Sequence, residues 1–133
     1  MKKIIVFLCL LGFVIGCKQT DNIETLTAKA EKGDAEAQYN LAKCYYDGKE
    51  VEQSFEKAVE WYKKAAKQGY AKAQNALGVC YHKGEGIEES LEKAVEWFEK
   101  SAKQGDSEGQ VLLGLSYCMG TGVEQSFEKA VEW

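Results

Sequence analysis

The chain repeats itself every 36 residues, and this period restricts the folds that it can adopt. Trp61, Trp97 and Trp133 are 36 positions apart, and two series of glycines keep the same spacing, Gly33/Gly69/Gly105 and Gly48/Gly84/Gly120. Periods of about 20 to 50 residues are typical of stacked structural repeats. The aligned copies cover residues 35–70, 71–106 and 107–133, so the third copy is shorter than the first two.

Each copy contains two segments with the periodicity of an amphipathic helix. In the first segment, Ala37, Leu41, Cys44 and Tyr45 fall at helical spacing and predict one buried face. The second segment starts at a serine and ends at Gln-Gly, as in Ser54 to Gly69. Small residues recur where two such helices would touch, at Ala42/Gly78/Gly114 and Ala58/Ala94/Ala130. The pattern therefore predicts an antiparallel helix pair in each copy.

The loop between the two helices of each copy contains glycines that predict its backbone conformation. It reads GKEVEQ, GEGIEE and GTGVEQ, so a second glycine is present in copies two and three, whereas copy one has Glu50. We expect a positive φ at this second glycine. The apolar residue that follows, Val51, Ile87 or Val123, is expected to fold back onto the helices.

These phrases resemble those of a known repeat family. The first and second helices closely match A-x-A-Q-x-x-L-G-x-x-Y-x-x-G-x-G-V and K-A-x-x-W-[YF]-x-K-A-A, the signature of the Sel1-like repeat, a relative of the tetratricopeptide repeat. The resemblance implies an all-α fold, a right-handed α-α superhelical solenoid of antiparallel helix pairs with a truncated third repeat. Residues 24–34 align with the end of a second helix and are expected to form a capping half-repeat.

The N-terminal residues have the layout of an export signal. Two lysines precede the apolar run Ile4–Ile15, which is shorter than the roughly 20 residues needed to span a bilayer. Val14-Ile15-Gly16-Cys17 resembles the lipobox of bacterial lipoproteins. We therefore expect a lipoprotein signal peptide at residues 1–16, lipidation at Cys17, a flexible tether at residues 17–23, and a location in the bacterial cell envelope, lipid-anchored to a membrane. In the alternative, general signal peptidase cleaves nearby and Cys17 is a spare thiol.

Composition argues against several classes of ligand. All 17 basic residues are lysine and the net charge is −4, so the guanidinium groups that read guanine edges are absent and nucleic acid is not an expected partner. His82 is the only histidine and has no metal-ligand pattern around it, so neither a metal nor a cofactor is expected. Cys44 and Cys80 are equivalent positions about 10 Å apart in stacked helices, too far for a disulfide, and are expected to be small buried hydrophobes.

One motif suggests enzymatic chemistry. The second helices begin Ser54-x-x-Lys57, Ser90-x-x-Lys93 and Ser126-x-x-Lys129, which match the S-x-x-K of serine β-lactamases. Some cysteine-rich Sel1-like proteins of bacteria are described as binding or hydrolysing β-lactams, so a hydrolase acting on β-lactam or peptidoglycan-like substrates is the alternative function. Because the motif starts every second helix, we favour a helix N-cap, worth about 1 kcal/mol each.

The favoured function is a non-enzymatic, envelope-anchored scaffold that binds a protein or peptide through its repeat surface. Residues that vary at equivalent positions are the candidate contacts: Tyr39, Asn75 and Val111, and Tyr46, His82 and Cys118. The third copy lacks nine of the 36 positions, so the chain is also interpretable as an incomplete gene product. We expect Phe127, Val131 and Trp133 to pack on the first helix of that copy, and fraying from about Ser126.

Overall fold

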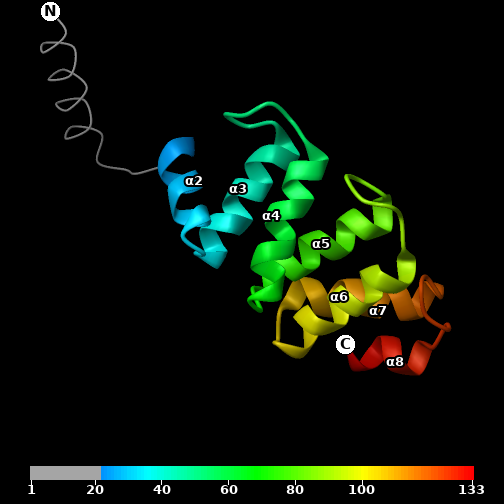
Figure 1. Cartoon of the computed structure of the whole chain (residues 1–133). Helices are drawn as coiled ribbons and strands as arrows, with labels where there is room; N and C mark the ends of the chain where they lie inside the picture. Colours follow the sequence, from blue (N-terminus) through cyan, green and yellow to red (C-terminus); the bar gives the residue numbers. More distant parts are fainter. Residues whose placement is uncertain (1–21) are drawn as a thin grey trace, which may run out of the picture.

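The structure is a computed structural model that describes residues 22–133, and within that range it contains seven α-helices and no strand (Figure 1). The leader, Cys17 and most of the predicted tether lie outside the described residues. The helices are α2 (Ile23–Glu31), α3 (Ala35–Asp47), α4 (Phe55–Lys67), α5 (Ala71–Lys83), α6 (Leu91–Lys103), α7 (Ser107–Met119) and α8 (Phe127–Glu132).

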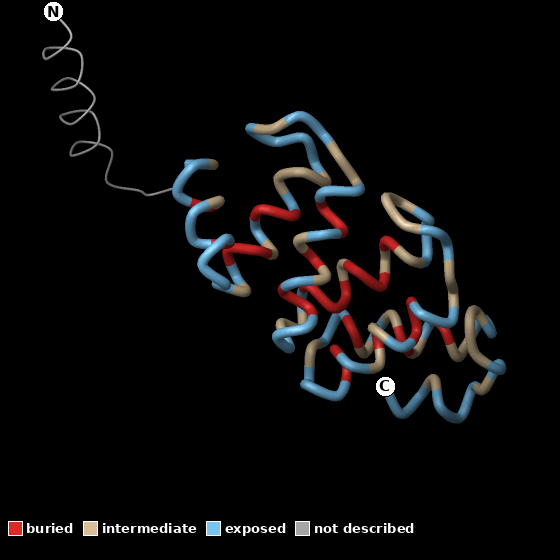
Figure 2. Tube along the Cα trace, viewed as in Figure 1, coloured by how far each residue is buried: buried red, intermediate tan, exposed pale blue. Residues whose placement is uncertain are grey.

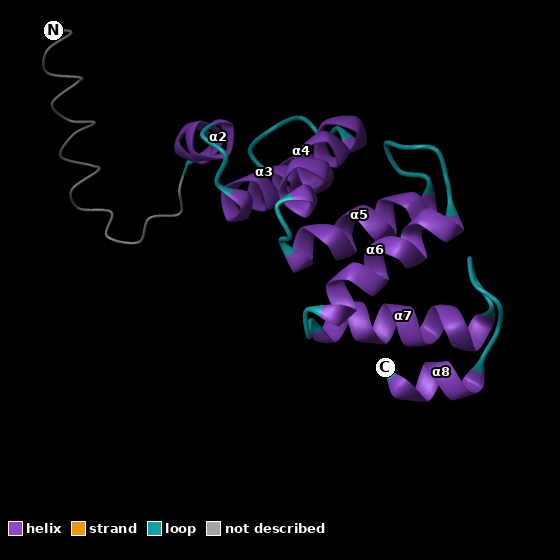
Figure 3. Cartoon of the chain, turned by 60° about the horizontal axis from the view of Figure 1, so that its bottom comes forward, coloured by secondary structure: helices purple, strands orange, loops and turns teal. Residues whose placement is uncertain are grey.

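The helices form three antiparallel pairs, and the pairs stack into a solenoid. The pairs are α3 with α4, α5 with α6, and α7 with α8, and neighbouring pairs meet through α4 with α5 and α6 with α7 (Figure 3). Each helix contacts mainly the next one along the chain, as expected for a repeat fold. The predicted all-α solenoid of helix pairs is therefore confirmed.

Local sequence signals fix the helix ends. The side chains of Ser54, Ser90 and Ser126 accept hydrogen bonds from the backbone N–H groups of Lys57, Lys93 and Lys129 at 3.3, 3.3 and 3.2 Å. Each second helix therefore begins with a serine N-cap, as predicted. The first helices end at a glycine in the left-handed conformation, such as Gly48 at φ +68°.

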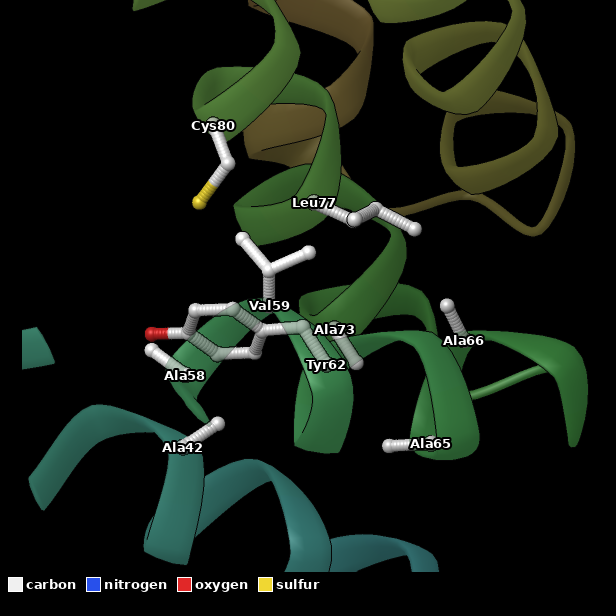
Figure 4. Close-up of a cluster of buried hydrophobic side chains, with 9 residues drawn as sticks. All are labelled: Ala42, Ala58, Val59, Tyr62, Ala65, Ala66, Ala73, Leu77 and Cys80. Atoms are coloured by element: carbon white, nitrogen blue, oxygen red, sulfur yellow. The ribbon is translucent and has the colours of Figure 1, made fainter. Parts of the chain in front are cut away.

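The core lies where the pairs meet (Figures 2 and 4). In Figure 4, Val59 and Tyr62 of α4 lie between Ala42 of α3 and Leu77 of α5, and all four are buried. The predicted small residues allow helices to approach closely. At Gly78 of α5, for example, a Cβ would lie 2.5 Å from the ring of Phe98 in α6. Cys80 is 1% exposed in the same cluster, which confirms that it packs as a small hydrophobe, whereas Cys44 is only half-buried. Cys44, Cys80 and Cys118 are all free thiols.

A glutamine in each of the first two copies joins successive pairs. Gln38 Nε2 donates to the Ala30 carbonyl at 3.0 Å, and Gln74 Nε2 donates to the Ala66 carbonyl at 3.2 Å. Gln68 and Gln104 then donate to the oxygens of Gln38 and Gln74, both at 2.8 Å. The Ala30 carbonyl of α2 thus accepts the bond that the Ala66 carbonyl of α4 accepts one copy later, and the capping half-repeat remains a prediction. The first residue of α2, Ile23, is the last residue of the range predicted for the tether.

The loops confirm the glycine prediction and show its cause. Gly86 and Gly122 have φ values of +72° and +74°, and a Cβ on either would overlap the backbone at the start of the preceding second helix, at Phe55 or Leu91. Glu50 holds the same conformation at φ +63° and is exposed. Glycine is thus required only where a preceding copy lies against the loop. The apolar residues that follow, Val51, Ile87 and Val123, are half-buried.

The C-terminal helix is much more exposed than its equivalents. Phe127 is 64% and Val131 85% exposed, whereas Val59 and Val95 are 3% and 4% exposed. The expectation that Phe127 and Val131 pack on the first helix of their own copy is therefore wrong. The reason is that Val59 is buried in a cluster with α5, the first helix of the following copy, and α8 has no such neighbour within the described residues. Fraying from Ser126 remains a prediction.

Candidate binding groove

Two adjoining cavities lie on the side of the stack that the first helices α3, α5 and α7 form. The aromatic cavity, of 220 Å³, is lined by Tyr39, Lys43, Tyr46, Asp47, Tyr62, Ala76, Val79 and Glu108. The apolar cavity, of 290 Å³, is lined by Val79, His82, Lys83, Phe98, Leu112, Leu115, Ser116, Met119 and Thr121. Val79 lines both, so the two cavities are neighbours, and we call them together the groove.

The two cavities are the same site in successive repeat junctions. Six residues that line the aromatic cavity have their equivalents, 36 positions later, in the apolar cavity: 43, 46, 47, 62, 76 and 79 correspond to 79, 82, 83, 98, 112 and 115. The helix framework is therefore constant, and the side chains at off-period positions give each cavity its chemistry.

Packed tyrosines form the aromatic cavity. The Tyr39 ring centroid lies 5.9 Å from that of Tyr62 and 5.4 Å from that of Tyr70, and the Lys43 ammonium lies 6.0 Å from the Tyr39 centroid. Burial, and then the negative charge of Glu108, raise the pKa of Tyr39, so its hydroxyl stays protonated. The cavity therefore presents rigid aromatic faces and neutral hydroxyls beside mixed charges.

A hydrogen-bonded bridge lies beside the aromatic cavity and includes one of its lining residues, Tyr46. The hydroxyl of Tyr46 donates to the carboxylate of Glu85, and Lys83 Nζ donates to the Tyr46 oxygen at 3.4 Å. The Tyr46 ring also packs on Phe55 with centroids 5.1 Å apart. Burial and the bond to Glu85 raise the pKa of Tyr46. The bridge ties α3 to the end of α5 and the loop that follows it.

The six candidate contacts are not brought together in one place. Tyr39 and Tyr46 line the aromatic cavity and His82 lines the apolar cavity. Val111 and Cys118 instead line a separate hollow beside α8. Sequence reasoning missed Val79, Leu115 and Met119, although they also vary between copies and could have been found from that signal.

Asn75 is placed in the interior rather than on the surface. Its side chain is 1% exposed, and its Nδ2 donates to Asp106 Oδ2 at 2.6 Å, while its Oδ1 has no partner. The same Asp106 oxygen accepts from the Gly109 N–H at 2.9 Å and caps α7. In this conformation Asn75 therefore joins α5 to the start of α7 and is not accessible to a partner.

The S-x-x-K motifs are arranged for capping. The serine hydroxyls bind backbone N–H groups, and the lysine ammonium groups of Lys57, Lys93 and Lys129 lie 5.4, 5.6 and 5.5 Å from tyrosine ring centroids of the first helices. A serine nucleophile needs a base within hydrogen-bonding reach, and these lysines are bound to aromatic faces instead. Nor do residues 22–133 contain a histidine, cysteine and carboxylate cluster fit for a metal ion.

Comparison with known families accounts for the period. The model of the Sel1 repeat matches residues 35–70, 71–106 and 107–133, which together make up most of the chain. The chain belongs to the Sel1 repeat family. Proteins of this family are helical-repeat scaffolds, so the groove lies on a scaffold fold. No curated protein matches the chain.

Solved structures of Sel1 repeat proteins have the same fold. A protective antigen of uropathogenic Escherichia coli strains that displays an SLR fold is 40% identical, with a TM-score of 0.82, over 84% of this chain and 24% of that one. A Sel1 repeat protein from Oxalobacter formigenes is 34% identical, with a TM-score of 0.77, over 83% of this chain and 45% of that one. The chain therefore spans less than half the length of either relative.

A more distant structure shows the fold alone. Helicobacter pylori cysteine rich protein B is 20% identical, with a TM-score of 0.67, over 88% of this chain and 86% of that one. Within residues 22–133 of the present chain, no helix is both long enough and apolar enough to cross a membrane.

Proposed function

We propose that this Sel1 repeat chain is a non-enzymatic scaffold of the bacterial cell envelope that binds a protein or peptide in the groove across α3, α5 and α7. The observation that carries the proposal is the shared lining residue Val79, which places the cavities of two successive repeat junctions next to each other. A partner segment that crosses the first helices would contact both cavities at once.

The side chains of the groove support binding rather than catalysis. Apolar and aromatic groups form most of its walls, and a few charged groups, such as Lys43, Asp47 and Glu108, lie at its edges. Clefts that recognise ligands have this composition, with polar groups that fix orientation. Exposed apolar side chains on α7, with Leu115 50% and Met119 68% exposed, are suited to burial under a partner.

The location is part of the proposal. The lipobox-like sequence ending at Cys17 supports export and lipidation, with several acyl chains holding the protein at a membrane. Globomycin treatment of expressing cells, together with a Cys17→Ser variant, tests this part. We expect unprocessed precursor in both cases, and normal processing of the variant would contradict lipidation at Cys17.

Binding in the groove is tested with purified chain immobilised as bait for solubilised envelope proteins. We expect a discrete partner to be retained by the native sequence and lost with the double variant Lys43→Glu and Leu115→Glu. The matched control is Glu60→Lys, which reverses an exposed charge on α4 outside both cavities. Retention of the same partner by the double variant would count against this groove.

The alternative hydrolase is tested directly with a fluorescent penicillin. Ser54, Ser90 and Ser126 are N-caps, and the lysine of each motif lies over a tyrosine ring, so we expect no covalent labelling at any of these serines. Acylation that is lost in a serine-to-alanine variant, together with turnover of the penicillin, would establish the hydrolase and overturn the scaffold proposal.

A further inference from the structure

We infer that the apolar cavity is a specificity pocket for one bulky apolar side chain, such as phenylalanine, flanked by acidic residues in an extended segment of the partner protein. This inference rests on the proposed function, because it concerns one part of the same groove. It assigns different tasks to the two cavities.

The difference between the cavities begins with the Tyr46 bridge. In the first junction the Tyr46 hydroxyl donates to Glu85 and accepts from Lys83. Their equivalents in the second junction are His82, Met119 and Thr121, all of which line the apolar cavity. This trio cannot form the same bridge, because the phenol, the ammonium and the carboxylate are all replaced. The second junction therefore lacks the bridge, and the residues at all three of its positions line the apolar cavity instead.

Other replacements make the second cavity apolar. Lys43, Ala76 and Val79 of the first junction correspond to Val79, Leu112 and Leu115 of the second. Phe98 forms part of its lining at 3% exposure, held against α5 by the close approach at Gly78. The result is an apolar hollow with a buried aromatic wall, open to the groove.

Size and charge define the occupant. A volume of 290 Å³ is at the lower limit for a small-molecule site, where pockets hold about 300 to 1,000 Å³, so it suits one large side chain rather than a cofactor. The ionisable residues among those that line it are His82 and Lys83, and neither carries a negative charge. Acidic residues beside the apolar side chain would therefore be attracted, and basic residues would be disfavoured.

The occupant reaches the pocket as an extended segment. The groove continues from the apolar cavity through Val79 to the tyrosines and mixed charges of the aromatic cavity. A partner chain anchored by one side chain would lie across α5 towards α3, where polar contacts are available from Lys43 and Asp47. The anchor residue thus sets which partner binds, and the aromatic cavity adds contact area.

The test uses nuclear magnetic resonance titration of ¹⁵N-labelled chain with three synthetic peptides. The probe is acetyl-Gly-Asp-Phe-Asp-Gly-amide, and the comparisons replace its Phe with Ala or both its Asp residues with Lys. We expect amide shifts at residues that line the apolar cavity, affinity at least about tenfold weaker for the Ala peptide, and a loss of about two- to fivefold for the Lys peptide.

A variant that rebuilds the first-junction bridge in the second junction makes the test specific. His82→Tyr, Met119→Lys and Thr121→Glu together place a larger ring and two charges in the lining, so we expect them to abolish binding of the Phe peptide while the fold is kept. Leu115→Glu is the second variant, which charges the cavity with one exposed substitution. Phe127→Glu, a similar change on α8 outside the cavity, is the control and should bind as the native chain does.

The outcomes separate this inference from the proposed function. Shifts confined to the aromatic cavity, or Phe-peptide binding that survives Leu115→Glu, would overturn the specificity pocket. If the bridged variant still retained the envelope partner while the Lys43→Glu and Leu115→Glu double variant did not, the groove would stand and the pocket would fall. If the bridged variant lost both the envelope partner and the Phe peptide, the result would support the groove and the pocket together.

Discussion

Gly86 lies directly against the carbonyl of Phe55, so close that a Cβ on residue 86 would overlap that oxygen. The contact joins the loop of the second copy to the start of the second helix in the first copy. Gly122 makes the equivalent approach to the Leu91 carbonyl. Repeat stacking in this chain therefore depends on backbone-to-backbone contact at each junction as well as on apolar side chains.

Replacement of Gly86 by alanine should be among the most destabilising surface-loop changes. It combines a left-handed φ of +72° with overlap at Phe55, and we expect a loss of about 2–4 kcal/mol in the free energy of unfolding. Gly69→Ala is the matched control, since φ is +88° but no atom lies within 4 Å of its Cβ, and should cost about 1 kcal/mol. Urea denaturation measures both, and equal losses would contradict the close-contact account.

Glu50→Gly should stabilise the chain. Glu50 is the one non-glycine residue with a positive φ in the described part of the chain, and glycine removes that backbone strain. We expect a gain of about 0.5–1 kcal/mol, because the greater entropy of glycine in the unfolded state offsets part of the relief. Glu52→Gly, at an exposed loop position without a positive φ, should be neutral or slightly destabilising in the same urea titration. A lower urea midpoint for Glu50→Gly than for the native chain would show that the Glu50 side chain stabilises the fold by more than its backbone strain destabilises it.

Asp106 should contribute more to the stability of the fold than its equivalent Asp34. Both cap a helix, accepting at 2.9 Å from Gly109 or Ala37, but only Asp106 also accepts from buried Asn75. We expect Asp34→Ala to cost about 1 kcal/mol and Asp106→Ala about 2–3 kcal/mol, because the latter also leaves a buried amide without its acceptor. Thermal and urea unfolding of the two variants provide the comparison, and a larger loss for Asp34→Ala would refute it.

Stability should fall in alkaline solution, partly through Cys80. Burial raises the pKa of its thiol from 9.0 to about 11, so the folded state keeps a proton that the unfolded state releases. The contribution is complete below about pH 9 and is lost as pH rises towards 11. Cys80→Ala removes this thiol, so its deficit in melting temperature relative to the native chain should shrink between pH 8 and pH 10.5. If the difference in melting temperature stayed the same from pH 8 to pH 10.5, the Cys80 thiol would not contribute to the loss of stability at alkaline pH.

The features that sequence analysis predicted are those that a single copy encodes. Serine caps, glycine helix ends and small contact residues follow from local pattern, so the helix pairs could be placed from the 36-residue period. Contacts between successive copies could not be predicted in this way, because they depend on how far one helix pair is rotated relative to the next. Tyr46 and Glu85 are 39 residues apart, one copy plus an offset, and no period indicates that pairing.

The candidate site shows the same limit. Tyr39, Asn75 and Val111 share one repeat position, yet they lie respectively at a cavity, in the interior and on an exposed face. Variation between copies indicates only which positions differ in chemistry. It does not distinguish between two causes of variation. One cause is contact with a partner, and the other, as at Asn75, is a different neighbouring residue in the next copy.

The most direct test of the account is photo-crosslinking in intact expressing cells, with p-benzoylphenylalanine placed at one position at a time. His82 is exposed and lines the apolar cavity, whereas Glu60 is exposed on α4 outside both cavities. The account predicts a discrete crosslinked protein from position 82, lost when Leu115→Glu is added, and none from position 60. A crosslink from position 60 with none from position 82 would contradict binding in the groove.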